Sequence, residues 1–204
     1  MHKEIRSFNF EVRAEQNETG HHLTGQPIVY NERTNLGWYD EIIDEGALAE
    51  TDLRDVRFLV NHNTDMIPLA RSRNNNANST MQMKVIPNVG MFIRVDLDTE
   101  NNADSRSLYS AVDRGDISGM SYMYIVDKDS WEDLDTDHPT RHIQSISKVF
   151  EVSACTFPAY EATSIQTRGL VDALESAKAS LESAKAELRA IDARKQKIRI
   201  LMEV

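Results

Sequence analysis

Short apolar runs separated by Gly, Pro, Asn and Asp fill the chain from about residue 3 to residue 165. Runs of about four to eight apolar or alternating residues, bounded by such turn formers, are typical of β-strands. They cover residues 5–12, 23–30, 39–43, 56–60, 81–97 and 117–126, and a further strand begins at residue 141. This pattern predicts a mainly β, antiparallel domain. Residues 127–139 are acidic and are expected to form a loop that carries Trp131.

One helix is predicted within this β domain. Residues 103–114 place Leu108, Ala111 and Val112 at helical spacing, and Gly115 follows them. Glycine is common directly after a helix because it adopts the left-handed conformation without steric cost. We therefore expect a helix that ends just before Gly115 and flanks the sheet.

The composition changes after Arg168. Apolar residues then recur every three or four positions, and neither Gly nor Pro follows Gly169; the apolar positions are Leu174, Ala177, Leu181, Ala184, Leu188, Ile191 and Ile198. Such spacing predicts an amphipathic heptad helix of roughly 30 residues. A helix of this kind needs a partner to be stable, because it buries nothing by itself. The sequence thus divides into a domain over residues 1–168 and a coiled-coil-like tail over residues 169–204.

The composition fits one globular domain with an appendage. Of 204 residues, 40% are hydrophobic and 27% charged, close to globular averages. A net charge of -10 repels polyanions, and Lys and Arg form no stripe with aromatics, so we expect a protein partner and no nucleic acid. No apolar stretch reaches the roughly 20 residues of a membrane span, so no membrane partner is expected. The single cysteine, Cys155, cannot form an internal disulfide, which suits a reducing compartment such as the cytoplasm.

Metal and cofactor sites find no support in the sequence. His-Glu-x-x-His, Cys-x-x-Cys and Gly-rich phosphate-binding motifs are all absent. The acidic residues between 127 and 137 lack the EF-hand spacing and its central glycine, so a solvated loop is the better interpretation. We expect neither a metal nor a cofactor.

His62 is the histidine best placed to act as a base. It follows the apolar strand at residues 56–60 and lies between Asn61 and Asn63, so its imidazole can stand at the edge of the sheet. The same three residues also fit a plain polar turn.

Two further polar residues lie within apolar strands. Ser121 interrupts a run of Met, Tyr, Ile and Val, and Glu151 lies between Phe150 and Val152. A serine becomes a nucleophile when a base takes its proton and a third group orients that base. Each residue also has a simpler interpretation: Ser121 can bond a neighbouring carbonyl, and Glu151 can face solvent.

Four blocks in this order resemble one protein family. They are residues 56–63 (VRFLVNHN), 68–71 (PLAR), 115–122 (GDISGMSY) and 150–160 (FEVSACTFPAY). With the opening pattern at residues 23–48, they resemble the prohead (capsid maturation) proteases of tailed double-stranded DNA phages over about residues 8–165. Ala70 and Met123 depart from the glycines of that pattern, and Met123 affects how closely a substrate backbone can approach Ser121.

The resemblance implies a catalytic triad. Ser121 matches the nucleophile and His62 the general base, and Glu151 takes the third position. Ser118 is the second candidate for the nucleophile. His142 is the rival to Glu151, because the related herpesvirus assemblins use serine with two histidines.

The resemblance also implies a fold and a function. The expected fold is an assemblin-like β-barrel with flanking helices. The expected activity is a serine endopeptidase that cleaves the major capsid protein, the scaffold and itself inside the immature prohead, in the cytoplasm of the bacterial host. The C-terminal helix would dock on scaffold, mediate self-association as a homodimeric coiled coil, or act as an autoinhibitory cap. The alternative is a non-enzymatic scaffold or capsid-assembly protein that keeps an inactive protease-like barrel.

Overall fold

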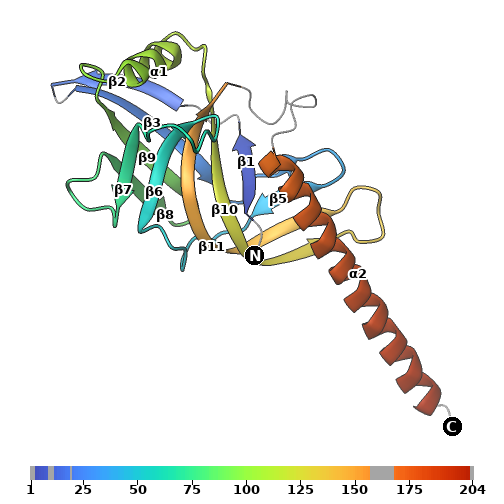
Figure 1. Ribbon diagram of the computed structural model, residues 1–204. Coiled ribbons are helices and arrows are strands. Elements are labelled where there is room, and N and C mark those ends of the chain that lie inside the picture. The colour runs from blue at the N-terminus through green and yellow to red at the C-terminus, as the bar shows by residue number, and fades with distance from the viewer. Residues whose placement is uncertain (1–2, 9–11, 19, 157–167, 203–204) are drawn as a thin grey trace.

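The computed structural model describes residues 3–8, 12–18, 20–156 and 168–202, whose strands form two sheets flanked by two helices (Figure 1). The larger sheet contains β1 (Glu4–Phe8), β4 (Thr34–Asn35), β5 (Asp40–Ile43), β6 (Asp55–Val60), β7 (Ala70–Arg73), β10 (Gly119–Glu132) and β11 (Thr140–Cys155). The smaller sheet contains β2 (Val12–Asn17), β3 (Gly20–Val29), β8 (Met81–Ile86) and β9 (Gly90–Leu97). The helices are α1 (Ala103–Asp113) and α2 (Arg168–Met202). The predicted mainly β fold with flanking helices is confirmed.

One hydrophobic core joins the two sheets. Leu23, Ile93 and Val95 of the smaller sheet share it with Phe58 and Tyr122 of the larger one. The expectation of a closed barrel is wrong for the described strands, because β2, β3, β9 and β8 pair only with one another and form a separate sheet. The arrangement is therefore two sheets packed over one core.

The long strand β11 organises the larger sheet. It runs antiparallel to β10, and its other edge pairs in parallel with β5 through residues 140–143 and with β6 through residues 151–154. The carboxyl ends of parallel strands lie at the same edge of a sheet, so the end of β6 reaches the end of β11. The pairing of Val60 with Ala154 shows this directly.

Two strand predictions need correction. Residues 5–12 form no single strand: β1 pairs with β10 and β2 pairs with β3, so the chain changes sheets between them. Residues 127–139 are not one loop, because β10 continues to Glu132 and includes Trp131. Asp127, Lys128 and Glu132 are exposed, whereas Trp131 is buried and Asp129 bonds Arg141 and Ser180 on the same face, so acidic composition concealed a strand.

Helix α1 ends as predicted. The side chain of Asn102 caps its first turn by accepting from the backbone N–H groups of Asp104 and Ser105. Arg114 caps the other end, and Gly115 follows with φ at +79°, in the left-handed region that favours glycine. The helix lies over the smaller sheet, near β2, β3 and β9 (Figure 1).

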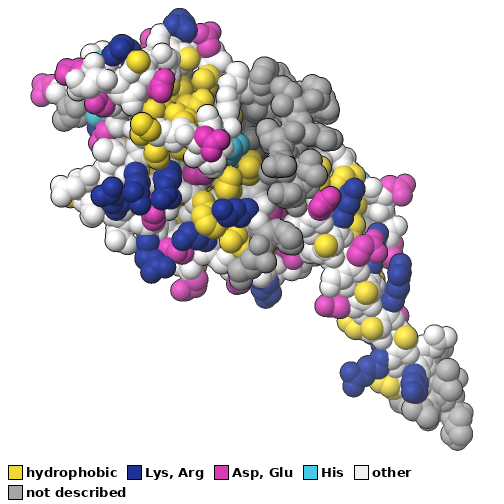
Figure 2. All heavy atoms as spheres, in the orientation of Figure 1, with side chains coloured by type: hydrophobic (Ala, Val, Ile, Leu, Met, Phe, Trp, Pro, Cys, Tyr) yellow, Lys and Arg dark blue, Asp and Glu magenta, His cyan; other side chains and the backbone are white. Residues whose placement is uncertain are grey.

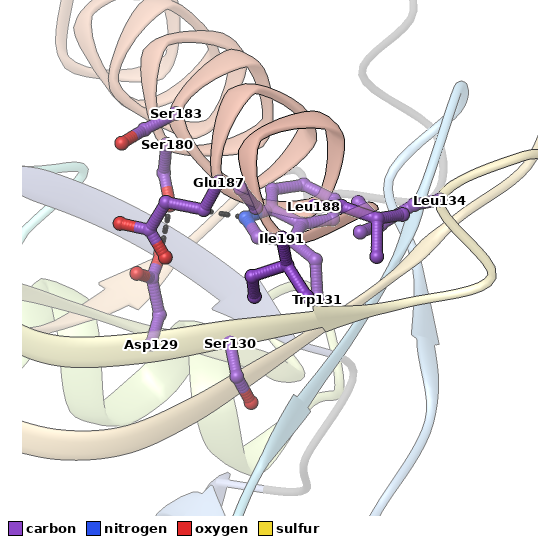
Figure 3. A pocket seen from close by; sticks show the side chains of 10 residues that line it. Asp129, Ser130, Trp131, Leu134, Ser180, Ser183, Glu187, Leu188 and Ile191 are labelled. Carbon is purple, nitrogen blue, oxygen red and sulfur yellow. Dashed lines mark hydrogen bonds between the residues drawn. The ribbon is translucent and has the colours of Figure 1, made fainter. Parts of the chain in front are cut away.

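The first half of α2 packs on the β domain. Ala177 and Leu181 are buried against Tyr39 and Trp131. Trp131 Nε1 donates to Ser180 Oγ at 3.0 Å (Figure 3). The expectation that this helix buries nothing by itself is therefore wrong for its first half.

The second half of α2 projects away from the sheets (Figure 1). Ile198 is 49% exposed there, and Ile191, which is 50% exposed, lines a pocket with Trp131 and Leu134 where the helix leaves the domain (Figure 3). A straight helix of 35 residues is about 50 Å long, which is more than the β domain can cover. No helix in the described part of the chain is both long and apolar enough to cross a membrane.

Candidate active site

The turn after β6 places His62 over β11. Asn61 and His62 have φ values of 50° and 56°, a left-handed conformation for which Asn and His are enriched among non-glycine residues. The Asn61 backbone N–H donates to Ala154 O, and its side chain bonds Thr156 through both amide atoms. The chain therefore turns back over the sheet at a fixed point, and the imidazole lies above the end of β11.

His62 and Glu151 form a hydrogen-bonded pair. His62 Nδ1 lies 2.5 Å from Glu151 Oε1, and their side chains are only 9% and 3% exposed. Glu151 faces the same side of the sheet as Ser153 and Cys155, since alternate residues of a strand share a face. A buried carboxylate at this position fixes the imidazole tautomer that keeps Nε2 as the acceptor.

Ser153 ties this pair to the backbone. Its hydroxyl donates to Glu151 Oε2 at 2.6 Å and accepts from the backbone N–H of His62 at 3.1 Å. Ser153 is fully buried. No motif in the sequence singles out Ser153, although the Glu-x-Ser-x-Cys alternation places three polar residues on one face of the strand.

The pKa of His62 is raised. Burial lowers the pKa of the imidazole, but hydrogen bonds to Cys155 and Glu151 and the charges of both outweigh burial, and the pKa rises to about 9. Cys155 Sγ lies 4.0 Å from Nε2. In this arrangement the imidazole is protonated at neutral pH.

Ser121 lies one strand away from the His62–Glu151 pair. It pairs with Ser153 in the antiparallel register, and directly opposed residues share a face. Its side chain is fully buried, and its hydroxyl donates to Arg6 O at 2.6 Å. That bond uses the proton that a general base would have to remove. Ser118 is exposed and precedes β10.

His142 lies at the other end of β11 from Glu151. It pairs with Ile42 of β5, and its Nδ1 is 2.8 Å from Asp44 Oδ1. The structure thus brings Glu151, and not His142, to His62. Pro158 and Ala159, which end the third motif, lie outside the described residues.

A buried ionic cluster anchors β1, the strand whose Arg6 carbonyl accepts the hydrogen bond from Ser121. Arg6 Nε donates to Glu41 at 2.6 Å, and Arg6 Nη2 donates to both Glu4 and Glu41 at 2.8 Å. Arg141 also donates to Glu4 at 2.8 Å, and Ser176 of α2 donates to Glu4 at 2.9 Å. Burial raises and the two guanidinium groups lower the pKa of Glu4, with a net lowering. Nothing in the residue spacing indicated this cluster.

Comparisons with known proteins identify the family of this chain. The family model of caudovirus prohead serine proteases matches residues 8–177. The prohead protease of Enterobacteria phage HK97 is 27% identical over 157 residues, which is 76% of this chain and 63% of that protein. The chain thus spans less than two thirds of the length of this relative. No solved structure matches this chain. The family model covers more than half of the sequence, and the chain therefore belongs to the caudovirus prohead serine protease family.

Proposed function

We propose that this chain is a serine endopeptidase that cleaves the major capsid protein, the scaffold and itself during prohead maturation. The observation that supports this best is the 2.5 Å contact between His62 Nδ1 and Glu151 on the face of the sheet that carries Ser121. By this proposal the enzyme works inside the immature prohead, in the cytoplasm of the bacterial host. The family and the related prohead protease of phage HK97 support the assignment.

The proposed reaction begins with proton transfer from Ser121 to His62. Ser121 Oγ attacks the carbonyl carbon of the scissile peptide while its proton moves to His62 Nε2. His62 then gives that proton to the leaving amine nitrogen, the C–N bond breaks, and an ester to Ser121 remains. Water hydrolyses the ester with His62 again as base. Glu151 accepts the Nδ1 proton and stabilises the imidazolium.

Two contacts change before this reaction. The Ser121 hydroxyl has to rotate away from Arg6 O toward His62, a change between staggered rotamers of one side chain. His62 Nε2 has to give up its contact with Cys155 Sγ and become unprotonated. By this proposal, the contacts of Ser121 with Arg6 O and of His62 with Cys155 belong to the resting state of the enzyme.

The decisive experiment labels the nucleophile. A fluorophosphonate probe should modify Ser121 in the full chain, and tryptic mass spectrometry should locate the adduct. Labelling should disappear in Ser121→Ala and His62→Ala and persist in Ser118→Ala. Labelling that persists in Ser121→Ala and disappears in Ser118→Ala would assign the nucleophile to Ser118.

A non-enzymatic assembly protein is the second candidate. The full burial of Ser121 and its bond to Arg6 O favour it. This candidate predicts no labelling of any serine in the wild-type chain and no shortening of the chain on expression. An expressed wild type that shortens, beside a Ser121→Ala variant that does not, excludes it.

The C-terminal helix is proposed to carry the protease into the prohead. Its projecting half exposes Ile191 and Ile198, so a partner helix can pack there. Self-association of two such helices is the other use of the same surface. Because the first half already packs on Trp131, the test should change the projecting half alone.

A further inference from the structure

We infer that a cavity beside Glu151 binds an apolar side chain of the substrate, and that the basic residues around it select a neighbouring acidic residue. This inference rests on the proposed function and specifies its substrate. The substrate class is an extended peptide segment that carries an apolar residue next to Asp or Glu.

The cavity lies on the catalytic face of the larger sheet. Glu151 lines it, together with Met123, which pairs with Glu151 across β10 and β11. Met123 is two residues after Ser121 and shares its face. Two residues of a strand span about 7 Å, so an extended peptide cut at Ser121 can place a nearby side chain in the cavity.

The floor of the cavity is apolar. Leu59, Met66, Met123 and Phe150 line it, and its volume is about 330 Å³. Ligand pockets usually measure about 300–1,000 Å³, so this cavity lies at the small end of that range and has room for one large side chain. Met66 and Pro68 belong to the segment that follows His62, so one wall of the cavity is continuous with the candidate catalytic turn.

The rim of the cavity carries positive charge. Lys3 and Arg57 line it, and the Lys3 ammonium lies 4.4 Å from the centre of the Phe150 ring. Lys148 Nζ lies 5.4 Å from the same ring. Three cations thus surround one apolar wall, in a chain whose net charge is -10.

Few carboxylates balance these cations. Asp55 is shared by Arg57 at 3.2 Å and Arg71 at 2.6 Å. Asp52 is likewise shared by Arg54 at 2.8 Å and Lys148 at 3.0 Å. The interaction described for Lys3 is with the Phe150 ring and not with a carboxylate.

The surface view agrees with this excess of positive charge. Figure 2 shows Lys and Arg side chains gathered over β6 and β7, beside hydrophobic side chains. Arg57 and Lys148 share their carboxylates with a second cation, and no ion pair links Lys3 to a carboxylate among the described residues, so an acidic residue of a peptide complements this rim.

Binding can be measured without catalysis in the Ser121→Ala chain. The probes are fluorescent Ala-rich peptides with one central Leu, flanked by Glu in one series and by Gln in the other. We expect the Glu series to bind about tenfold more tightly at low salt, with the difference shrinking in 0.5 M NaCl. Lys3→Gln and Arg57→Gln should each reduce the ratio about threefold, as typical exposed ion pairs do. Lys84→Gln, an exposed change on β8, should leave the ratio unchanged.

The apolar part of the inference has its own variant. Met123→Gly should enlarge the cavity and favour peptides with Phe in place of Leu, whereas Met123→Phe should favour Ala. Equal binding of the Glu and Gln series, or a preference that survives in the Lys3→Gln and Arg57→Gln double variant, would overturn the inference. The labelling of Ser121 tests the proposed function separately, so failure of one is distinguishable from failure of the other.

Discussion

Ser153 and Ser121 face each other across β11 and β10, but their hydroxyls have different partners. Ser153 Oγ bonds Glu151 and the backbone of His62, whereas Ser121 Oγ donates to Arg6 O. One serine therefore holds the proposed base and its orienting acid in place, and the other carries the proposed reactive hydroxyl. The first prediction separates these two roles.

Ser153→Ala should lower kcat/KM about 10- to 100-fold while the chain stays folded. The change removes a donor to Glu151 and leaves a buried oxygen unsatisfied, a cost of about 1–3 kcal/mol that loosens the His62–Glu151 pair. Peptide cleavage and fluorophosphonate labelling measure the loss, and the NMR titration of His62 should shift as well. Ser145→Ala on the same strand, whose hydroxyl bonds only exposed Asp127, is the matched control and should keep full activity. Equal activity of both variants contradicts the positioning role.

The second prediction concerns the orienting group. His62→Ala should be inactive, and Glu151→Gln should retain more activity, because an orienting acid contributes less than the base that it orients. His142→Ala should behave like the wild type, since its Nδ1 contacts Asp44. Rates of peptide cleavage compare the three variants. Full activity of Glu151→Gln with loss in His142→Ala would support a Ser-His-His arrangement instead.

The third prediction concerns pH. A general base has to be unprotonated, so activity should rise with pH through the pKa of His62, which is about 9. Cys155→Ala removes one of the contacts that raise this pKa, so the midpoint of the pH–rate profile should move to lower pH. The kcat/KM profile of the two chains, from pH 6 to pH 10, measures the shift. An unchanged midpoint would show that the thiol does not act on His62.

The same pKa shift affects stability. The pKa of His62 lies above its ordinary value of 6.5 in the folded chain, so protonation stabilises the fold. This contribution is fully present below about pH 6.5 and is lost as the pH rises through about 9. Chemical denaturation of His62→Gln and wild type should therefore converge at high pH. A constant difference between the two chains at all pH values contradicts the linkage.

The fourth prediction tests how α2 is attached. Ala177 is fully buried against the Trp131 cluster, so Ala177→Glu should cost about 3 kcal/mol or more by burying a charge, which is roughly 6–12 °C in Tm. Ala186 lies on the exposed face of the same helix, so Ala186→Glu is the matched control. Thermal unfolding by circular dichroism compares them. Equal Tm values would mean that the helix does not pack on the domain in solution.

The fifth prediction tests delivery by the projecting half of α2. In a Ser121→Ala background, which prevents self-digestion, Ile191→Glu with Ile198→Glu should lower the protease copy number per purified prohead. Ala190→Glu with Ala193→Glu, at exposed positions of the same turns, adds the same negative charge and is the matched control. If the copy number is unchanged, and the wild-type and control chains sediment as dimers but the Ile191→Glu, Ile198→Glu chain as a monomer, the helix serves self-association rather than delivery.

Sequence patterns predicted the local features of this molecule better than its long-range contacts. An apolar run that ends at Val60 predicted the strand before His62, and helical spacing with a following glycine predicted α1. The loop predicted from the acidic stretch around Trp131 was wrong, because a strand can carry several charged residues beside one buried aromatic ring. The packing of α2 on Trp131 could not be predicted, since an apolar stripe shows that a helix face is buried but does not identify the surface that buries it.

The site shows the same limit. The family motifs pointed to Ser121, His62 and Glu151, and the structure brings the last two into contact. The partners of Ser121 and Glu151 depend on which strands pair and in which register. Arg6 is 115 residues from the serine whose proton it accepts, so no local pattern could reveal that bond.

That bond places the proposed nucleophile at the end of a mechanical linkage. Ser176 of α2 donates a hydrogen bond to Glu4, and Arg6 of the same edge strand also donates to Glu4. The backbone carbonyl of Arg6 then accepts the hydrogen bond from Ser121. Among the described strands, β1 pairs with β10 alone. A displacement of β1 from β10 would separate Arg6 O from the Ser121 hydroxyl. The attachment of α2 to the domain is thus connected to the hydrogen bond of the Ser121 hydroxyl through four residues, Ser176, Glu4, Arg6 and Ser121.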